Sequence, residues 1–187
     1  VAMRVWEEAP FHEGDELPQS RWNGILERTN RIRGRGQALA LLARTEHSRF
    51  LLSRKLLQRG HEPQVIDPVL DELEADGSLS DERFAEGWVR SRLRSHPEGR
   101  SHLLAGLRTR GVDGALAESA IDRVLREGER SMVEAARSYA ERLTRRRALD
   151  ARALADRLYR RGFAGTVVRT VVGELDPGDA TGEEWPE

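Results

Sequence analysis

Cysteine is absent from this chain of 187 residues, and lysine occurs only once, at Lys55. The absence of cysteine excludes disulfides, thiolate zinc sites and cysteine nucleophiles together. No apolar run reaches the length of a membrane span, and no segment has the apolar centre of a signal peptide. We therefore expect a cytoplasmic protein with no membrane partner. Alternating β-branched runs are also missing, which argues against strands.

Residue groupings typical of catalysis are missing as well. The five histidines form no HExxH motif and no pair four residues apart, so we expect no zinc site. A Walker loop is not present, because Gly34-x-Gly36 follows no strand and lacks the Gly-Lys-Ser/Thr ending. We expect a protein that is not an enzyme, with no catalytic residue, metal or cofactor.

What the chain does contain is one pattern in three copies, centred on Gly60, Gly111 and Gly162, which lie 51 residues apart. An arginine precedes each glycine, and leucines stand four and eight residues before it. Apolar residues return 5, 9, 10 and 13 positions after it, with the period of a helix. Such a fixed spacing indicates tandem repeats, each one supersecondary unit.

The spacing predicts three short helices in each repeat. The central helix begins at an N-cap, Ser48, Gly99 or Asp150, and ends at the Arg-Gly pair, where glycine adopts the left-handed conformation cheaply. A second helix follows the glycine, and a further amphipathic helix precedes the pair. In the first repeat Pro68 falls where the others have helix interior, so the helix either begins at Asp67 or is kinked.

The predicted fold class is all-α, with disordered ends around three tandem three-helix repeats. The first residues contain glycine, proline and charged residues with no helical period, which indicates disorder. The last residues are acidic and include no basic residue, so we expect a disordered acidic tail. The predicted organisation is a disordered extension at 1–36, repeats at 37–77, 78–128 and 129–176, and an acidic tail at 177–187.

Arginine clusters are the main candidates for binding. An arginine recurs at the same position of each repeat, as Arg59, Arg110 and Arg161. These arginines are either equivalent residues along a binding groove, or helix-end cations that complement the helix dipole. The irregular clusters at 90–100 and 142–161 exceed what helix ends need. The candidate contact residues are Arg90, Arg92, Arg94, Arg100, Arg110, Arg145, Arg146, Arg147, Arg152, Arg160 and Arg161.

Several aromatic and basic segments leave two interpretations open. Trp88, with its counterpart Tyr139, fits core packing, and a base-stacking platform is the alternative. The run RIRGRG at 31–36 fits a solvated linker, or a short contact with a phosphate backbone. Trp6, Trp22 and Trp185 are partner anchors or simply exposed residues.

The run from Leu79 to Arg92, which reads LSDERFAEGWVRSR, follows VLDELEADG and precedes further copies of the Leu-x3-Leu-x2-Arg-Gly pattern. Together these features resemble RecX, the bacterial family that regulates the RecA recombinase. The resemblance covers about residues 37–175. It implies a monomer of three tandem three-helix units in an elongated, curved arrangement.

The resemblance also implies a function in DNA repair, recombination and the SOS response. A RecX protein binds along the groove of the RecA–single-stranded-DNA filament and limits its extension, ATP hydrolysis, strand exchange and co-protease activity. Direct binding of single- and double-stranded DNA is a further family property. The helix GRSHLLAGLRTRG at 99–111 is less basic than the family pattern, and both ends lie outside it.

Two classes of function therefore remain open. The first is a modulator of a recombinase filament. The second is a stand-alone nucleic-acid-binding repeat module, against which the acidic ends argue, because they repel phosphate or compete for a basic face.

Overall fold

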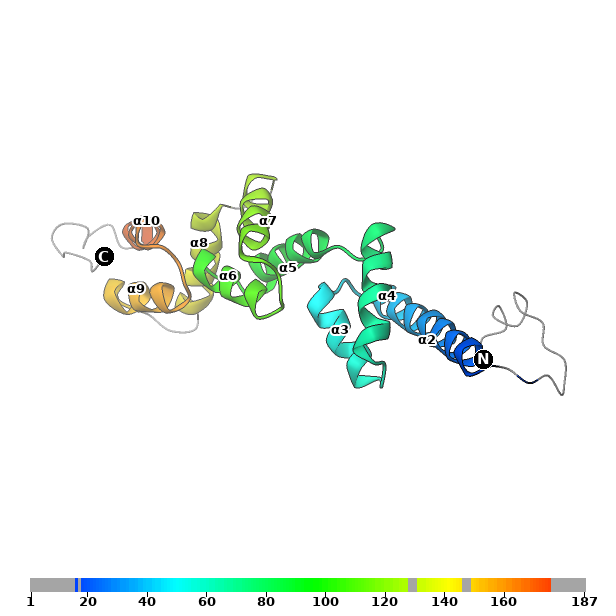
Figure 1. Ribbon diagram of the computed structural model, residues 1–187. Coiled ribbons are helices and arrows are strands. Elements are labelled where there is room, and N and C mark those ends of the chain that lie inside the picture. Colours follow the sequence, from blue (N-terminus) through cyan, green and yellow to red (C-terminus); the bar gives the residue numbers. More distant parts are fainter. Residues whose placement is uncertain (1–15, 17, 128–130, 146–148, 176–187) are drawn as a thin grey trace. The chain divides into compact units, whose positions relative to one another are not determined.

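The computed structural model describes residue 16 and residues 18–127, 131–145 and 149–175. Helices are the only regular elements among them, in agreement with the predicted all-α class (Figure 1). In chain order they are α2 (Gln19–Leu42), α3 (Arg49–Gln58), α4 (Pro63–Ala75), α5 (Asp81–Ser95), α6 (Arg100–Arg108), α7 (Gly114–Glu127), α8 (Met132–Thr144), α9 (Ala151–Arg160) and α10 (Gly165–Leu175).

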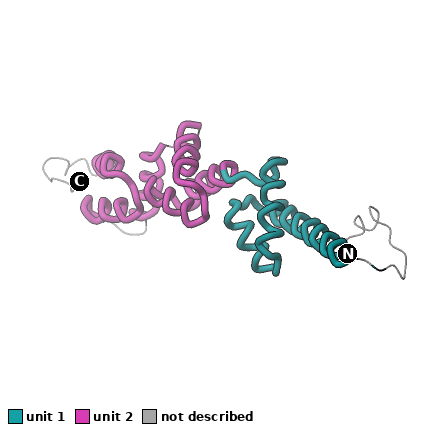
Figure 2. Tube along the Cα trace, viewed as in Figure 1, with its two compact units in different colours: residues 1–81 teal, residues 82–187 magenta. Residues whose placement is uncertain are grey.

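The chain divides into two compact units, residues 1–81 and residues 82–187 (Figure 2). In the first unit α4 packs against both α2 and α3. Its core is made by Leu52 and Leu56 of α3 with Leu70 and Leu73 of α4, all almost fully buried. In the second unit α6 packs against α7, and α8, α9 and α10 pack against one another.

The predicted glycine turns are confirmed in all three copies. Gly60, Gly111 and Gly162 have φ values of 83°, 77° and 83°, in the left-handed region that disfavours side chains. After each glycine, the next N–H donates to the carbonyl of the leucine five residues earlier, at 3.2 Å in every copy. This bond is the signature of a Schellman motif, which satisfies a carbonyl that the helix end leaves free.

The predicted N-caps are also present, with one informative exception. The Ser48 Oγ accepts from the Leu51 N–H at 3.2 Å, and the Asp150 Oδ1 accepts from the Ala153 N–H at 2.7 Å. Gly99 occupies the same place at the start of α6 without a capping side chain. The pattern alone does not explain why the middle repeat lacks this cap.

The prediction that residues 1–36 are disordered is wrong for residues 19–36, which belong to α2. The run at 31–36 is therefore neither a linker nor a free basic patch. Arg35 pairs with Asp76 at 2.7 Å, and Arg31 pairs with Glu72. Gly34 is buried beside Val65, so the helix is stabilised by contacts with α4 and not by its own apolar pattern. Residues 1–15 and 177–187 lie outside the described residues.

Each repeat has an ion pair between its first and third helices, and the paired positions recur every 51 residues. Arg35 of α2 lies 3.7 Å from Glu72 of α4. At the corresponding positions Glu86 of α5 lies 3.0 Å from Arg123 of α7, with the charges exchanged. Arg137 of α8 makes a two-nitrogen contact with Glu174 of α10 at 2.8–3.0 Å. The register thus extends to residue 35, which falls within the segment expected to be disordered.

Pro68 lies in the interior of α4, which begins at Pro63. Of the two alternatives for this helix, a start at Asp67 is therefore wrong. Pro63 sits in the first turn, where the missing N–H costs nothing because that group has no partner within the helix.

A close backbone contact joins the second and third repeats within the second unit. The Gly99 N–H donates to the Arg161 carbonyl at 2.9 Å, and the Ser101 Oγ donates to the Gly162 carbonyl at 3.1 Å. A Cβ on Gly99 would lie only 1.8 Å from that Gly162 oxygen. This approach explains the missing cap: the turn of the third repeat occupies the space of a side chain.

We expect Gly99→Ala to destabilise the second unit by about 2 kcal/mol or more, because a methyl group there forces two backbone segments apart. The measurement is urea unfolding followed by circular dichroism. The matched control is Gly87→Ala in α5, where an added Cβ meets nothing within 4 Å. That change should stabilise by roughly 0.5–1 kcal/mol, as alanine does for glycine inside a helix. Equal effects of the two changes would contradict the close contact.

Candidate anion-binding surface

An aromatic ring and an arginine meet at corresponding positions of the second and third repeats. The Arg110 guanidinium lies 4.7 Å from the centre of the Trp88 ring, and the Arg161 guanidinium lies 5.5 Å from that of Tyr139. Both rings are half-buried, so the expected core position is realised only in part. Stacked guanidiniums cover the rings where apolar side chains would cover a core residue.

Trp88 has arginines beside it and a glycine beneath it. Arg92 lies 5.3 Å from the ring centre, in addition to Arg110. A Cβ on Gly106 would lie 2.4 Å from the ring, so α6 accepts the indole only because residue 106 is glycine. These contacts leave the Trp88 ring poorly placed as a stacking platform for a base.

Most arginines predicted to contact a partner in the second repeat already have intramolecular partners. Arg90 lies 3.0 Å from Glu86 and 3.3 Å from Glu127, and Arg110 donates to the Gly106 carbonyl at 2.7 Å. Among the described residues Arg94 makes no side-chain ion pair, and it is exposed.

Arg100 is engaged by Asp122 of α7. The hydrogen bond between the two side chains raises the pKa of Arg100 and lowers the pKa of Asp122. The charged form of each group is therefore favoured by the fold. Arg100 serves to hold α6 against α7, in contrast to its predicted role as a contact residue.

Arg161 participates in the contact between the second and third repeats. Its Nε donates to the Pro97 carbonyl at 3.1 Å, and its guanidinium lies 3.5 Å from Glu98. The Glu98 side chain is only 8% exposed and also pairs with Arg92 at 3.1 Å. A buried carboxylate between two guanidiniums offsets its lost hydration only through such contacts. Arg161 is therefore partly a structural residue.

Three candidate arginines of the third repeat have no ion pair with the described residues. Arg145, Arg152 and Arg160 are exposed, and none of them pairs with a carboxylate of the described residues. Arg146 and Arg147 lie outside those residues. The structure thus separates the candidates into arginines occupied by helix packing and arginines available to a partner.

A hollow of about 390 Å³ lies in this repeat, lined by Tyr139, Arg157, Arg160 and Arg161. No carboxylate lines it. At the register position of Arg157 the second repeat has Gly106, where the larger Trp88 ring fills the space. At the corresponding place in the third repeat, the smaller Tyr139 ring and Arg157 line the hollow. Guanidiniums bind phosphate and carboxylate groups through paired N–H donors, so the hollow fits an anion.

Arg157 lies within the cluster at 142–161 that the sequence indicates for binding, but it is not one of the individual contact residues predicted there. The signal that identifies it is its position in the repeat, since it replaces a glycine and stands four residues before the register arginine Arg161. On a helix this spacing places the two side chains on one face.

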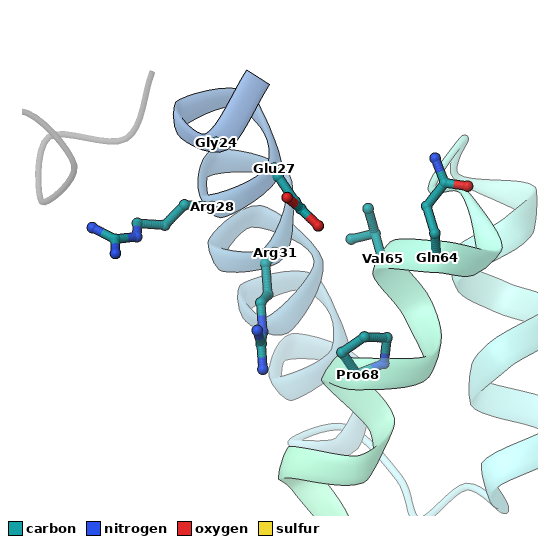
Figure 3. A pocket seen from close by; sticks show the side chains of 7 residues that line it. All are labelled: Gly24, Glu27, Arg28, Arg31, Gln64, Val65 and Pro68. Carbon is teal, nitrogen blue, oxygen red and sulfur yellow. The ribbon is translucent and has the colours of Figure 1, made fainter. Parts of the chain in front are cut away.

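A second hollow, of about 280 Å³, lies between α2 and α4 in the first unit (Figure 3). Glu27 points toward Val65, whereas Arg28 points away from α4 (Figure 3). Arg31 at its edge is already paired with Glu72. Its mixed charges and occupied arginine make this hollow a weaker anion site than the one in the third repeat.

The described part of the chain has neither a membrane-spanning helix nor a cluster of metal ligands. None of its helices combines the length and the low polarity that crossing a bilayer requires. No cluster of three or more histidine, aspartate or glutamate side chains suited to a metal ion occurs there either.

Comparison with known families gives a consistent result. The model of the first three-helix domain of RecX matches residues 35–73, and that of the second matches residues 80–121. The regulatory protein RecX of Halorhodospira halophila is 40% identical over 155 residues, which are 79% of this chain and 91% of that protein. The regulatory protein RecX of Treponema pallidum is 39% identical over 132 residues, which are 71% and 79%.

Two crystal structures have a similar fold. RecX from Lactobacillus salivarius aligns with a TM-score of 0.69 at 22% identity, over 80% of this chain and 99% of that one. A further regulatory protein RecX aligns with a TM-score of 0.75 at 20% identity, over 91% and 87%.

We expect Glu98→Gln to destabilise the second unit by about 1–3 kcal/mol, because two arginines then face a neutral group. The matched control is Glu127→Gln, which removes an exposed carboxylate, 58% accessible, from an ion pair with Arg90. An exposed pair contributes about 0–1 kcal/mol, so the control should change little. Urea unfolding in low and high salt measures both variants. A loss at Glu98 no larger than at Glu127 would contradict the buried position of Glu98.

Proposed function

The chain belongs to the RecX family of regulatory proteins, and on this premise we propose that it is a non-enzymatic inhibitor of RecA in the cytoplasm. It binds in the groove of the RecA–single-stranded-DNA filament and limits filament extension. ATP hydrolysis, strand exchange and co-protease activity fall as a consequence. DNA repair, recombination and the SOS response are the processes in which it acts.

The observation that supports this proposal is the set of exposed arginines on the third repeat. Arg145, Arg152 and Arg160 have no carboxylate partner among the described residues, whereas Arg90 and Arg100 of the second repeat do. Unpaired arginines fit phosphate groups of the bound DNA, or acidic side chains of RecA, with little rearrangement. We propose these three arginines as contact residues, together with Arg94.

The tandem repeats support binding to a filament. A filament presents identical subunits at a regular spacing, and a chain of similar three-helix units can contact more than one of them. Contacts shared among adjacent subunits act at a high effective concentration, so weak individual contacts add up to firm binding. A few molecules bound in this way affect many subunits.

A stand-alone nucleic-acid-binding module is the second candidate function. The same exposed arginines favour it, since guanidiniums neutralise phosphates whatever the base sequence of the nucleic acid. The two candidates differ in stoichiometry and in salt dependence. A simple DNA binder must cover the strand, and its affinity falls with a log–log slope of about −0.7 for each phosphate contact on single strands.

The test is a titration of RecA ATPase activity on single-stranded DNA at two salt concentrations, with DNA binding measured in parallel. We expect inhibition well below one molecule per RecA subunit, at a salt concentration that abolishes binding to DNA alone. Inhibition that follows DNA coverage at both salt concentrations would contradict the filament proposal and support the second candidate.

The contact residues are tested by replacing Arg145, Arg152 and Arg160 with glutamine in one variant. We expect the concentration for half-inhibition to rise about tenfold or more, as expected from losing roughly 1.4 kcal/mol of binding. The matched control replaces Arg108, Arg126 and Arg169, three exposed arginines of α6, α7 and α10. An equal loss of inhibition in the control would show that net charge, and not these three arginines, determines the inhibition.

A further inference from the structure

The hollow in the third repeat has a positive lining without an anion to balance it. Arg157 and Arg160 make no ion pair with the described residues, and Arg161 is shared with Glu98 and Tyr139. Three guanidiniums in one place repel each other unless an anion or solvent screens them. The three guanidiniums favour a ligand with a carboxylate or phosphate group. An aromatic ring of the ligand can also stack on a guanidinium that no ring of the protein covers.

A ligand of this chemistry occurs in the chain itself, directly after α10. Residues 176–187 read DPGDATGEEWPE, with five carboxylate side chains, no lysine and no arginine. Glu183 and Glu184 are adjacent, and Trp185 follows them. The segment therefore combines two adjacent carboxylates with one aromatic ring, which matches the guanidiniums of the hollow in charge and in stacking capacity.

The helix that precedes this segment, α10, packs against α8 and α9, and these two helices carry residues that line the hollow. Glu174, one residue before the end of α10, is held by Arg137 of α8 at 2.8–3.0 Å. Tyr139 of the hollow is two residues farther along the same helix, a rise of about 3 Å, and it projects from a different face of α8. The eight residues from Asp176 to Glu183 span up to about 26–29 Å when extended, which is more than twice the diameter of a helix. The covalent connection therefore allows Glu183 and Glu184 to reach the arginines.

We propose that the hollow of the third repeat is a carboxylate-binding site and that its ligand is the acidic segment 176–187 of the same chain. Glu183 and Glu184 pair with Arg157 and Arg160, and Trp185 stacks on an arginine side chain. The connection to α10 gives the segment a millimolar effective concentration, so a weak site is filled without an external ligand.

The consequence for regulation rests on the proposed function. While the segment occupies the hollow, Arg157 and Arg160 are closed to other anions, such as the phosphates of filament DNA or acidic side chains of RecA. An anionic partner must displace it, so the segment reduces affinity in the free protein and is released on binding. The contact itself requires neither RecA nor DNA.

The first experiment measures the contact without RecA or DNA, on the full chain labelled with 5-fluorotryptophan. The fluorine resonance of Trp185 is assigned with Trp185→Phe. We expect Arg157→Gln combined with Arg160→Gln to shift this resonance toward that of a free peptide of residues 176–187. The control pair Arg108→Gln and Arg126→Gln should leave it in place. A resonance that already matches the free peptide in the unsubstituted chain would overturn the proposal.

The second experiment is a double-mutant cycle with labelled oligothymidylate as the polyanionic probe. Neutralising the segment by Asp179→Asn, Glu183→Gln, Glu184→Gln and Glu187→Gln should tighten binding about fivefold at low salt, because a competing ligand is removed. In the background of Arg157→Gln and Arg160→Gln this gain should disappear, while it should persist with the control pair. A gain of the same size in both backgrounds would show general repulsion between charges, and would overturn the proposal.

The two experiments also separate this inference from the proposed function. A fluorine shift together with the expected cycle supports the contact even where the protein fails to inhibit RecA. A Trp185 shift that depends on protein concentration would place the segment on a second copy of the chain, and would overturn the intramolecular contact.

Discussion

The turn at Gly162, packed against the first residues of α6, determines where Arg161 of the third repeat lies. It leaves no space for a side chain at residue 99, where an added Cβ would be 1.8 Å from the Gly162 oxygen. The same turn positions Arg161, which contacts the Pro97 carbonyl, Glu98 and the Tyr139 ring. These contacts hold Arg161 in place. Arg161 then lines the hollow together with Tyr139 and Arg157. The packing of one turn therefore connects the repeat architecture to the arginine-lined hollow.

The helical repeats could be predicted from the sequence because glycine turns and caps are local features. Gly60, Gly111 and Gly162 adopt the conformation that their spacing indicates. The part of α2 before residue 37 could not be found in this way, because it is stabilised by contacts distant in sequence, such as Arg35 with Asp76. Its composition of charge and glycine resembles that of disordered segments. A signal for this part of the helix exists in the sequence, because Arg35, Glu86 and Arg137 occupy the same position of their repeats. It can be recognised only when their partners in the third helix of each repeat are compared as well.

The candidate site was less predictable, since an arginine in a sequence does not reveal its partner. Arg90 and Arg100 are used to hold helices together, while Arg152 and Arg160 of similar appearance remain unpaired. Pairing depends on which carboxylates the fold brings close, such as Glu127 for Arg90 across 37 residues. A regulator that binds an anionic filament needs arginines of both kinds. The paired ones keep the repeat rigid, and the unpaired ones offer binding without first breaking an internal contact.

The central claim is that the unpaired arginines of the third repeat face the partner. Site-specific photocrosslinking tests it most directly, with p-benzoylphenylalanine placed at position 152 or 160 and, for comparison, at position 108 or 126. The labelled protein is bound to RecA filaments on single-stranded DNA and irradiated. We expect crosslinks to RecA or DNA from positions 152 and 160, and few from positions 108 and 126. Efficient crosslinks from positions 108 and 126, with none from 152 and 160, would contradict it.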